Sequence, residues 1–437
     1  MMKKQIPLCL FAGLLMASHA QAVDVYGAAP TAQTIALGGI YLGSTGPTDA
    51  LATNPALLVS VGRPYLEFTA MGMFAGGQFH NATPYVGSLQ SDMGVSGSAG
   101  FGMQIPHTQL SIGLGVFPVS LLSDRWTYQD PPGTAGASYG IRSSKSAFLA
   151  IQSSFGLAYQ VSKHLALGAA FGVVDNLNTL ETPYVFQTNP TLAGLKTLLD
   201  LHTSGIGYNG TFGVVAKPAS RFELALDYKT RTTVRTTGTA NGDAFAQFAA
   251  LGLPYASSFH YRAEVDNVFP QSASIGLAWQ AQRRLRTYLQ ADWLNWRDAF
   301  RQLPVHLTGG NNTLLNTLLN STSLNDSVPL EWKNQLTVRT GFEFSLRESV
   351  TLQGAYSHGN SPVPASTLTP LTADISTDVL SAGLAYTKNR YRVQLAYQAN
   401  LPTAASVGMS GLLAGEYSNT RVSLWLQTLA LTTGIRF

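Results

Sequence analysis

The chain has 437 residues, of which 45% are hydrophobic, 10% aromatic and only 11% charged. Average proteins carry about 25% charged residues, so this composition excludes a disordered, solvating chain. The 27 basic and 23 acidic residues give a net charge of +4. No long basic run marks a nucleic-acid-binding surface, and we expect no nucleic-acid partner.

Residues 1–22 have the pattern of a secretory signal peptide. Lys3 and Lys4 form a charged start, a short apolar run follows, and Ala20-Gln21-Ala22 matches an A-x-A cleavage site. The apolar run is shorter than the ~20 residues of a membrane-spanning helix. We therefore expect export of a mature chain that begins at Val23.

The only cysteine, Cys9, lies inside this signal. A mature chain without cysteine has no disulfides, no thiol catalysis and no cysteine-ligated metal. The histidines are isolated from one another in the sequence, so no metal site is predicted. The Gly-x-Gly-x-x-Gly pattern at 205–210 opens a strand and does not precede a helix, so it does not indicate nucleotide binding.

Residues 23–63 form a segment that does not alternate between apolar and polar positions. It is rich in glycine and alanine, carries little charge and contains the turn-forming pair Asn54-Pro55. These features favour a packed segment over a loose tail.

From residue 64 onward, apolar and polar residues alternate with a period of two. In 390–398, for example, Tyr391, Val393 and Leu395 oppose Arg392 and Gln394, which gives a strand one oily and one polar face. We predict fourteen strands, at 64–74, 92–105, 108–120, 145–161, 164–176, 205–217, 221–235, 258–280, 285–297, 331–346, 349–358, 377–388, 390–399 and 418–437.

Six tight connections alternate with seven long ones, the longest at 121–144, 177–204, 236–257 and 298–330. An even strand count with alternating short turns and long loops is typical of an outer-membrane β-barrel. A soluble all-β sandwich also alternates, but several of these segments exceed the usual 5–6 residues of soluble strands. The sequence therefore predicts one all-β domain at 64–437, a 14-stranded antiparallel transmembrane barrel in the outer membrane of a Gram-negative bacterium.

A barrel of fourteen strands has a lumen too wide for its own side chains to fill. We therefore predict that residues 23–63 form a plug, or hatch, in this lumen. The chain ends with Leu429, Leu431, Ile435 and Phe437 on one strand face. We expect the barrel-assembly machinery to recognise this strand, which ends in Phe437, and we expect its apolar face to contact outer-membrane lipid.

Several stretches of the sequence resemble the FadL family of outer-membrane transporters. Two of them are 36–43 and 49–57, and the Asn54-Pro55-Ala56 within the second is the most specific match. The remaining matches are 291–296, 332–343, Ser361 to Pro364 and the closing Gly434 to Phe437. Together they span nearly the whole mature chain.

The resemblance implies a monomeric barrel that imports long-chain fatty acids or other hydrophobic compounds, aromatic hydrocarbons included. It implies no cofactor and no enzymatic activity. The hydrophobic ligand would be captured by extracellular loops, released by rearrangement of the hatch, and discharged sideways through a kink in the third strand. The hatch and gating residues would be Gly38, Gly39, Asn54, Pro55 and Ala56.

The third strand carries Gly113, Gly115 and Pro118, which are candidates for the lateral opening because proline removes a ladder donor. A bulge without a gap would use the same residues. The loop at 298–330 shows roughly helical leucine spacing. The ligand-capture candidates in it are Leu307, Leu314, Leu315 and Leu318. The alternative for this loop is that it packs on itself.

Lys229, Arg339 and Arg392 face the lumen by strand parity and could meet a carboxylate ligand. Acidic residues share that side, so a lattice of ion pairs that holds strands and hatch is the favoured interpretation. Three other functions stay open: a surface receptor or adhesin, a small-solute porin, and an outer-membrane hydrolase whose triad comes from distant residues.

Overall fold

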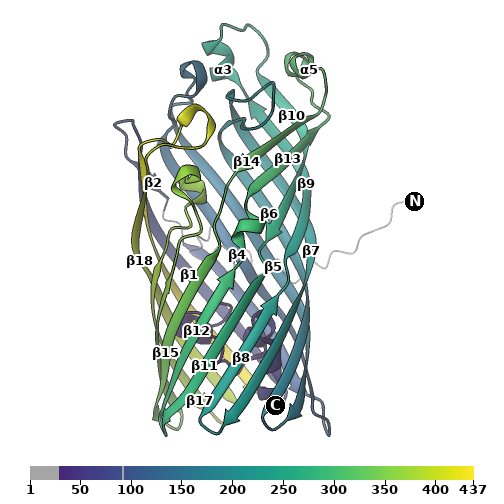
Figure 1. Cartoon of the computed structure of the whole chain (residues 1–437), viewed down its shortest axis with the longest axis vertical. Helices are drawn as coiled ribbons and strands as arrows, with labels where there is room; N and C mark the ends of the chain where they lie inside the picture. Colours follow the sequence, from purple (N-terminus) through teal and green to yellow (C-terminus); the bar gives the residue numbers. More distant parts are fainter. Residues whose placement is uncertain (1–28, 91–92) are drawn as a thin grey trace, which may run out of the picture.

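The computed structural model describes residues 29–90 and 93–437, so the predicted signal peptide lies outside the described residues. An antiparallel sheet closes on itself because the last strand, β19 (Thr420–Arg436), pairs along its whole length with the first, β1 (Tyr65–His80) (Figure 1). Nineteen strands are described. One of them, β2, is a short extra strand in a loop. Eight others form four pairs, and each pair makes up one barrel strand that is interrupted along its length. The sheet is thus a 14-stranded barrel, as predicted.

The uninterrupted strands between these two are β3 (Gly94–Gln104), β4 (Leu110–Gln129), β5 (Ile141–Ser162), β6 (Leu165–Val185), β7 (Lys196–Ala219), β16 (Val350–Gly359), β17 (Asp378–Lys388) and β18 (Tyr391–Val407). The interrupted ones are β8 (Phe222–Lys229) with β9 (Thr232–Asp243), β10 (Ser258–Phe269) with β11 (Ser272–Gln282), β12 (Leu285–Leu294) with β13 (Gln302–Thr308), and β14 (Leu324–Pro329) with β15 (Gln335–Arg347). The short addition β2 is Gly87–Leu89.

Helical elements are short. They are α1 (Ala32–Ala36), α2 (Pro47–Ala52), α3 (Phe245–Ala250), α4 (Trp296–Ala299), α5 (Thr313–Leu319) and the 3-10 turns η3 (Pro55–Ser60), η4 (Thr134–Gly136), η5 (Ala365–Thr367), η6 (Pro370–Thr372) and η7 (Leu413–Gly415). No helix among the described residues has the length and apolar character needed to cross a bilayer.

The barrel is oily outside and polar inside. On β5, Phe155 and Leu157 are 45% and 40% exposed, whereas Gln152 and Ser154 on the opposite face are buried. A soluble sandwich would bury the first pair and expose the second. The alternation is therefore that of a sheet whose outer face meets lipid.

The two ends of the barrel differ (Figure 1). Helices α3 and α5 stand at one end, called the loop end, and tight turns gather at the other, called the turn end. Several strands reach further toward the loop end than predicted: β6, β7 and β9 occupy much of the expected loops at 177–204 and 236–257. The loop at 298–330 is partly helical, as its leucine spacing suggested, but α5 is flanked by β13 and β14.

Residues 29–63, called the internal segment, lie inside the barrel toward the turn end (Figure 1). Helix α1 contacts β17 and β18, α2 contacts β3 and β4, and η3 contacts β5, β6 and β7. Since these strands lie on different sides of the barrel, the segment is surrounded by wall.

Candidate functional site

The Asn54-Pro55-Ala56 turn of the internal segment docks against two glycines in the wall. Asn54 caps η3 by accepting a hydrogen bond from the Ala56 N–H at 3.1 Å. Its amide also donates to the carbonyl oxygens of Val214 at 3.3 Å and Leu226 at 3.0 Å, on β7 and β8. The turn can approach because the wall offers Gly168 and Gly213, which are directly paired.

A Cβ on either glycine would collide with this turn. At Gly213 it would overlap the Asn54 side-chain oxygen, and at Gly168 it would overlap the backbone of Pro55 and Ala56. The register between β6 and β7 places the two glycines opposite each other. Their lack of side chains therefore creates the recess that the turn fills.

Gly38 and Gly39 form a second docking point. Both have positive φ angles, +62° and +94°, which side-chain-bearing residues rarely adopt. The Gly38 carbonyl accepts hydrogen bonds from Ser357 Oγ at 2.8 Å and from the Arg339 guanidinium. Arg339 is also ion-paired with Asp292 on β12, so this cation links two strands to the segment.

Polar groups inside the barrel fix the rest of the segment. Buried Glu67 on β1 accepts a hydrogen bond from the Thr48 N–H at 2.8 Å, and Arg392 on β18 donates to Thr45. Asp49 accepts from three hydroxyls of the segment itself, at 2.7, 2.8 and 3.1 Å, those of Thr31, Ser44 and Thr34. Arg339 and Arg392 therefore contact the segment directly, and the third predicted lumen cation, Lys229, lines a cavity inside the barrel.

Strand β4 is irregular beyond Val116. Up to that residue it pairs with β3, the last pair being Val116 with Ala99. From Phe117 to Asp124 every residue is buried, so the two-residue alternation is lost. Among the described residues, β4 regains a partner on that side only near Arg125, whose carbonyl accepts from the Gln90 N–H.

A bulge lies at the start of this stretch. Pairing with β5 jumps from Pro118 opposite Ile151 to Ser120 opposite Ala150, which leaves Val119 as the extra residue. Over the same height, the first residues of β3, from Gly94 to Ser98, pair with β1. The described wall therefore has an interruption between β3 and β4, and Pro118, which lacks an N–H donor, stands at its edge.

Gly113 and Gly115 lie elsewhere. Both are in the regularly paired part of β4, and a Cβ on them would meet Leu58 at 2.8 Å and Leu51 at 3.0 Å respectively. These two glycines make room for the internal segment, whereas Pro118 belongs to the interruption.

A cavity of about 160 Å³ lies between the internal segment and the interrupted stretch of β4. One side is apolar and the other carries charged groups. Its apolar lining includes Ile35, Met71, Met73, Phe117, Val119 and Leu121, and its polar lining includes Asp227, Lys229, Asp292 and Arg339. Lys229 lies near Asp227, with which it interacts electrostatically.

Above the membrane-facing band, the polarity of the wall reverses. On β9 and β10, Arg235 faces outward and pairs with Asp266 at 3.0 Å and Glu264 at 3.3 Å. The inward faces there form an apolar cluster with the helical loops: Phe186, Leu192, Leu201, Phe248, Phe259, Tyr261, Leu307, Leu315 and Leu324. We call this cluster the apolar mouth.

The ligand-capture candidates are divided at this mouth. Leu307 and Leu315 are buried in it and Leu314 packs against it, whereas Leu318 points away and is half-exposed. Leu192 and Leu201, from the hairpin of β6 and β7, belong to the same cluster.

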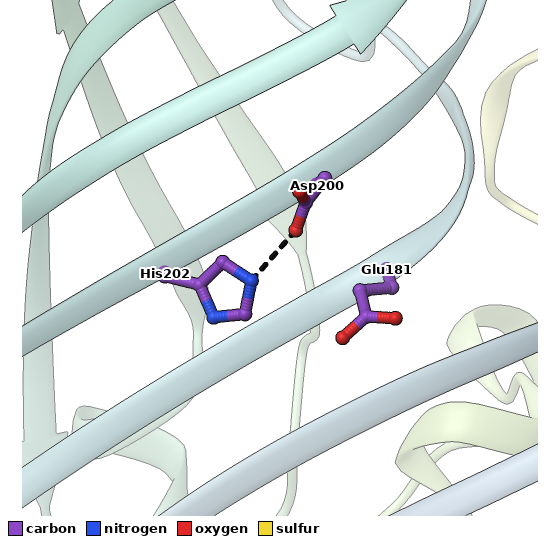
Figure 2. A group of neighbouring side chains, drawn as sticks. All are labelled: Glu181, Asp200 and His202. Atoms are coloured by element: carbon purple, nitrogen blue, oxygen red, sulfur yellow. Dashed lines mark ion pairs between the residues drawn. The ribbon is translucent and has the colours of Figure 1, made fainter.

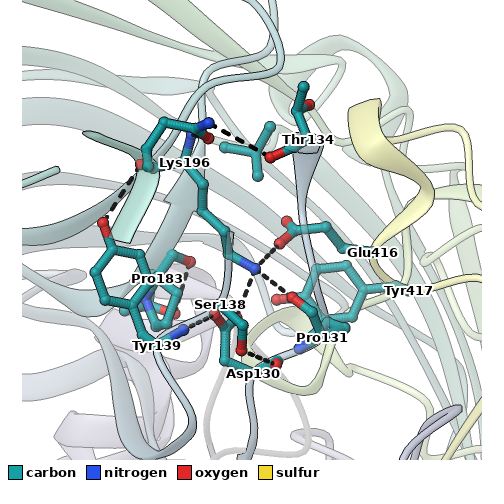
Figure 3. Close-up of polar contacts among 12 residues, drawn as sticks. Asp130, Pro131, Thr134, Ser138, Tyr139, Pro183, Lys196, Glu416 and Tyr417 are labelled. Carbon is teal, nitrogen blue, oxygen red and sulfur yellow. Dashed lines mark hydrogen bonds and ion pairs between the residues drawn. The ribbon is translucent and has the colours of Figure 1, made fainter. Parts of the chain in front are cut away.

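A buried lysine ties the loops together at this end (Figure 3). Lys196, at the start of β7, is fully buried. Its Nζ lies 2.7 Å from Asp130 Oδ1 and 2.5 Å from Glu416 Oε1, and it donates to the Pro131 carbonyl at 2.5 Å. Asp130 follows β4 and Glu416 precedes β19, so one ammonium joins segments from three hairpins.

One lysine balances only one of these two carboxylates. Burial raises the pKa of Glu416 to about 7, although attraction to Lys196 lowers it. Burial likewise raises the pKa of Asp130, against the pull of Lys196 and of the Tyr139 N–H. We call these three residues the loop tie. Sequence reasoning missed it because its members come from distant loops and share no spacing.

Comparisons with known proteins agree with this architecture. The structure of the Pseudomonas putida toluene transporter TodX matches with a TM-score of 0.74 at 17% identity, over 95% of this chain and 99% of that one. A Pseudomonas aeruginosa FadL homologue matches with a TM-score of 0.74 at 14% identity, over 95% and 100%. The Ralstonia pickettii toluene transporter TbuX gives 0.72 at 17% identity, over 95% and 100%. At sequence identities this low, the structural similarity establishes only that this chain has the same fold as these proteins.

A comparison with curated proteins found no match. Residues 14–407, however, match the model of the family described as outer membrane protein transport protein (OMPP1/FadL/TodX). That span covers most of the chain, including the internal segment, the interrupted β4 and the apolar mouth. The chain therefore belongs to the OMPP1/FadL/TodX family of outer membrane transport proteins.

Proposed function

We propose that this protein takes up hydrophobic compounds passively across the outer membrane and discharges them sideways through the interruption between β3 and β4. The observation that carries the proposal is the cavity. It is bounded by the internal segment on one side and by Phe117, Pro118, Val119 and Leu121 of the interrupted stretch on the other. A solute held there is next to the break in the wall.

Entry would begin at the apolar mouth. An oily solute gains free energy when it leaves water for an apolar surface, about 25 cal/mol per Å² buried. Because the polarity is reversed at the loop end, the inner surface of the barrel is apolar there and its outer surface is polar. A sideways exit then spares the solute a second passage through water, because the lipid face lies directly outside the interruption.

The internal segment would act as the gate, with Gly38, Gly39 and the Asn54-Pro55-Ala56 turn as its docking points. The segment is held to several strands by hydrogen bonds, some of them with charged wall side chains such as Arg339, Arg392 and Glu67. A modest rearrangement of it would enlarge the cavity toward β4. No energy source is required if the solute moves down its own concentration gradient.

The size and charge of the cavity favour a small uncharged ligand. A dry cavity of about 150 Å³ holds a benzene molecule, which is close to the volume here. Arg339 is already paired with Asp292 and Lys229 interacts with Asp227, so a carboxylate would compete with protein acids. We therefore propose monoaromatic hydrocarbons as first substrates, the class that TodX and TbuX are named for.

Long-chain fatty acids, which the sequence resemblance implies, are the second candidate. They would need the internal segment to move before the cavity could hold the chain. Their support is that Leu180 packs against both the apolar mouth and the buried apolar cluster that contains Leu121 of β4.

Extraction of the purified protein followed by mass spectrometry separates these candidates. Co-purified or exchangeable toluene, with no bound fatty acid, would support the first, and bound palmitate would support the second. Permeation of sugars through the intact protein would identify a porin instead. An empty protein that binds neither ligand and passes no solute would favour the receptor or adhesin. We further propose a monomer that is delivered through recognition of the lipid-facing Phe437 strand by the assembly machinery.

A further inference from the structure

On the outer surface of the barrel, near the loop end, three potential metal ligands converge (Figure 2). Glu181 lies on β6, and Asp200 and His202 lie on β7. One ligand atom from each falls within 4.8 Å of the others, the only such group of three among the described residues. We propose that these three side chains bind a divalent first-row transition metal such as Zn²⁺.

Strand register brings the three together. Glu181 is directly opposite Asp200, and His202 is two residues further along β7, so all three side chains emerge on the same face. Two donors on one strand and a third on its hydrogen-bonded neighbour give a rigid base for chelation. Asp200 and His202 are two residues apart in the sequence, but Glu181 becomes their neighbour only through the pairing of β6 with β7, so the sequence alone predicts no metal site here.

The face is the outer one. On β7, Ile206 and Tyr208 share the parity of Asp200 and His202 and are exposed to lipid. Asp200 and His202 lie six and four residues beyond Ile206, about 13–20 Å along the strand at ~3.3 Å per residue. The site is therefore beyond the apolar band and accessible to ions in the medium, away from the cavity.

The donor atoms are oriented for a cation. His202 Nδ1 is 3.3 Å from Thr179 Oγ1, which can accept a hydrogen bond from an Nδ1–H and so leave Nε2 as a lone-pair donor. Nε2 lies 2.7 Å from Asp200 Oδ1, a contact that forms an ion pair when the imidazole is protonated (Figure 2). With the imidazole neutral, these two atoms are close enough to share a metal cation in place of the proton.

The donor set selects the type of metal. An imidazole with two carboxylates suits Zn²⁺ and its neighbours, whereas Ca²⁺ takes six to eight oxygens. Zn²⁺ in a four-coordinate site would keep one position for water. The Glu181 side chain is 45% exposed and can rotate to bring its oxygen into range.

One neighbouring cation opposes the metal. Lys145 Nζ, on β5, lies 3.6 Å from Glu181 Oε1. Replacing it by an uncharged residue should strengthen metal binding, an effect that a purely structural role for the three ligands would not produce.

The test uses the untagged, full-length protein in detergent, stripped with a chelator and titrated with Zn²⁺ alone by calorimetry. We expect one equivalent bound by the wild type, at least about tenfold weaker binding for His202→Ala and Asp200→Asn, and tighter binding for Lys145→Gln. His260→Ala is the matched control, an exposed histidine on β10 whose Nδ1 contacts Asn241. It should bind as the wild type does.

Absorption of Co²⁺ in the same variants reports whether a nitrogen ligand is present. The heat-dependent electrophoretic shift of the barrel confirms that each variant is folded. Binding to wild type no stronger than to His202→Ala, or equal losses in His202→Ala and His260→Ala, would overturn the proposal.

Discussion

At the scale of single residues, the docking of the internal segment depends on wall positions that carry no side chain. Gly213 must have no Cβ, because one would overlap the Asn54 side chain. We predict that Gly213→Val displaces the Asn54-Pro55-Ala56 turn and raises the conductance of single barrels in planar bilayers. Gly210→Ala is the matched control on the same strand, since a Cβ there meets nothing closer than 3.4 Å. Equal conductance in both variants would show that the turn does not seal the lumen.

Asn54 itself tests the same contact from the other side. Asn54→Ala removes a cap worth about 1 kcal/mol and two hydrogen bonds to the wall, each worth about 1 kcal/mol. We expect the internal segment to become sensitive to protease while the barrel stays folded. Unchanged protease resistance would mean that packing alone holds the turn.

At the scale of elements, the loop tie makes the loop end sensitive to pH. The folded-state pKa of Glu416 is about 7 and exceeds its ordinary value, so the closed loops bind the proton more tightly than open ones. This stabilisation is fully present below the ordinary pKa and is lost as the pH rises through about 7. Hydrogen exchange of residues 412–419, corrected for intrinsic rates, should therefore be faster at about pH 8 than at about pH 5.

Glu416→Gln mimics the protonated side chain and keeps its shape. We expect its exchange to be slow at both pH values, while Lys196→Met, which leaves Asp130 buried without its cation, should be fast at both. A wild-type chain whose protection does not change with pH would contradict this account of the loop tie.

How far the sequence predicts these elements depends on where each lies relative to the membrane. Within the band that faces lipid, opposite polarities on the two strand faces revealed all fourteen strands. Beyond it the polarity reverses, as with outward Arg235 and inward Val234, so the sequence pattern does not predict the ends of β6, β7 and β9 as strands. Pro118 marked the irregular stretch of β4, but no sequence feature identifies Val119 as the extra residue. Gly113 and Gly115 suggested a kink, although they accommodate Leu58 and Leu51.

At the scale of the whole molecule, stability rests on an outer face that lipid must cover. Leu395 on β18 faces outward within the apolar band and is 49% exposed. We predict that Leu395→Arg destabilises the barrel by about 2–4 kcal/mol, the cost of an arginine near the bilayer midplane. Thr239→Arg, on the outer face of β9 beyond the band, should cost little. Urea unfolding in lipid vesicles measures both, and equal stabilities would contradict the lipid-facing assignment.

The central claim is that hydrophobic solutes leave the barrel through the interruption between β3 and β4. Deletion of Val119 removes the bulge and restores the register of β4 with β5, and deletion of Ala281, at the register shift beyond Gln280, is the matched control. The decisive measurement is uptake of labelled toluene and palmitate by cells that express equal amounts of each form in the outer membrane. We predict that the wild type and the Ala281 deletion exceed the empty vector for at least one compound, and that the Val119 deletion falls to the vector level. Uptake by the Val119 deletion equal to that of the wild type would contradict the account.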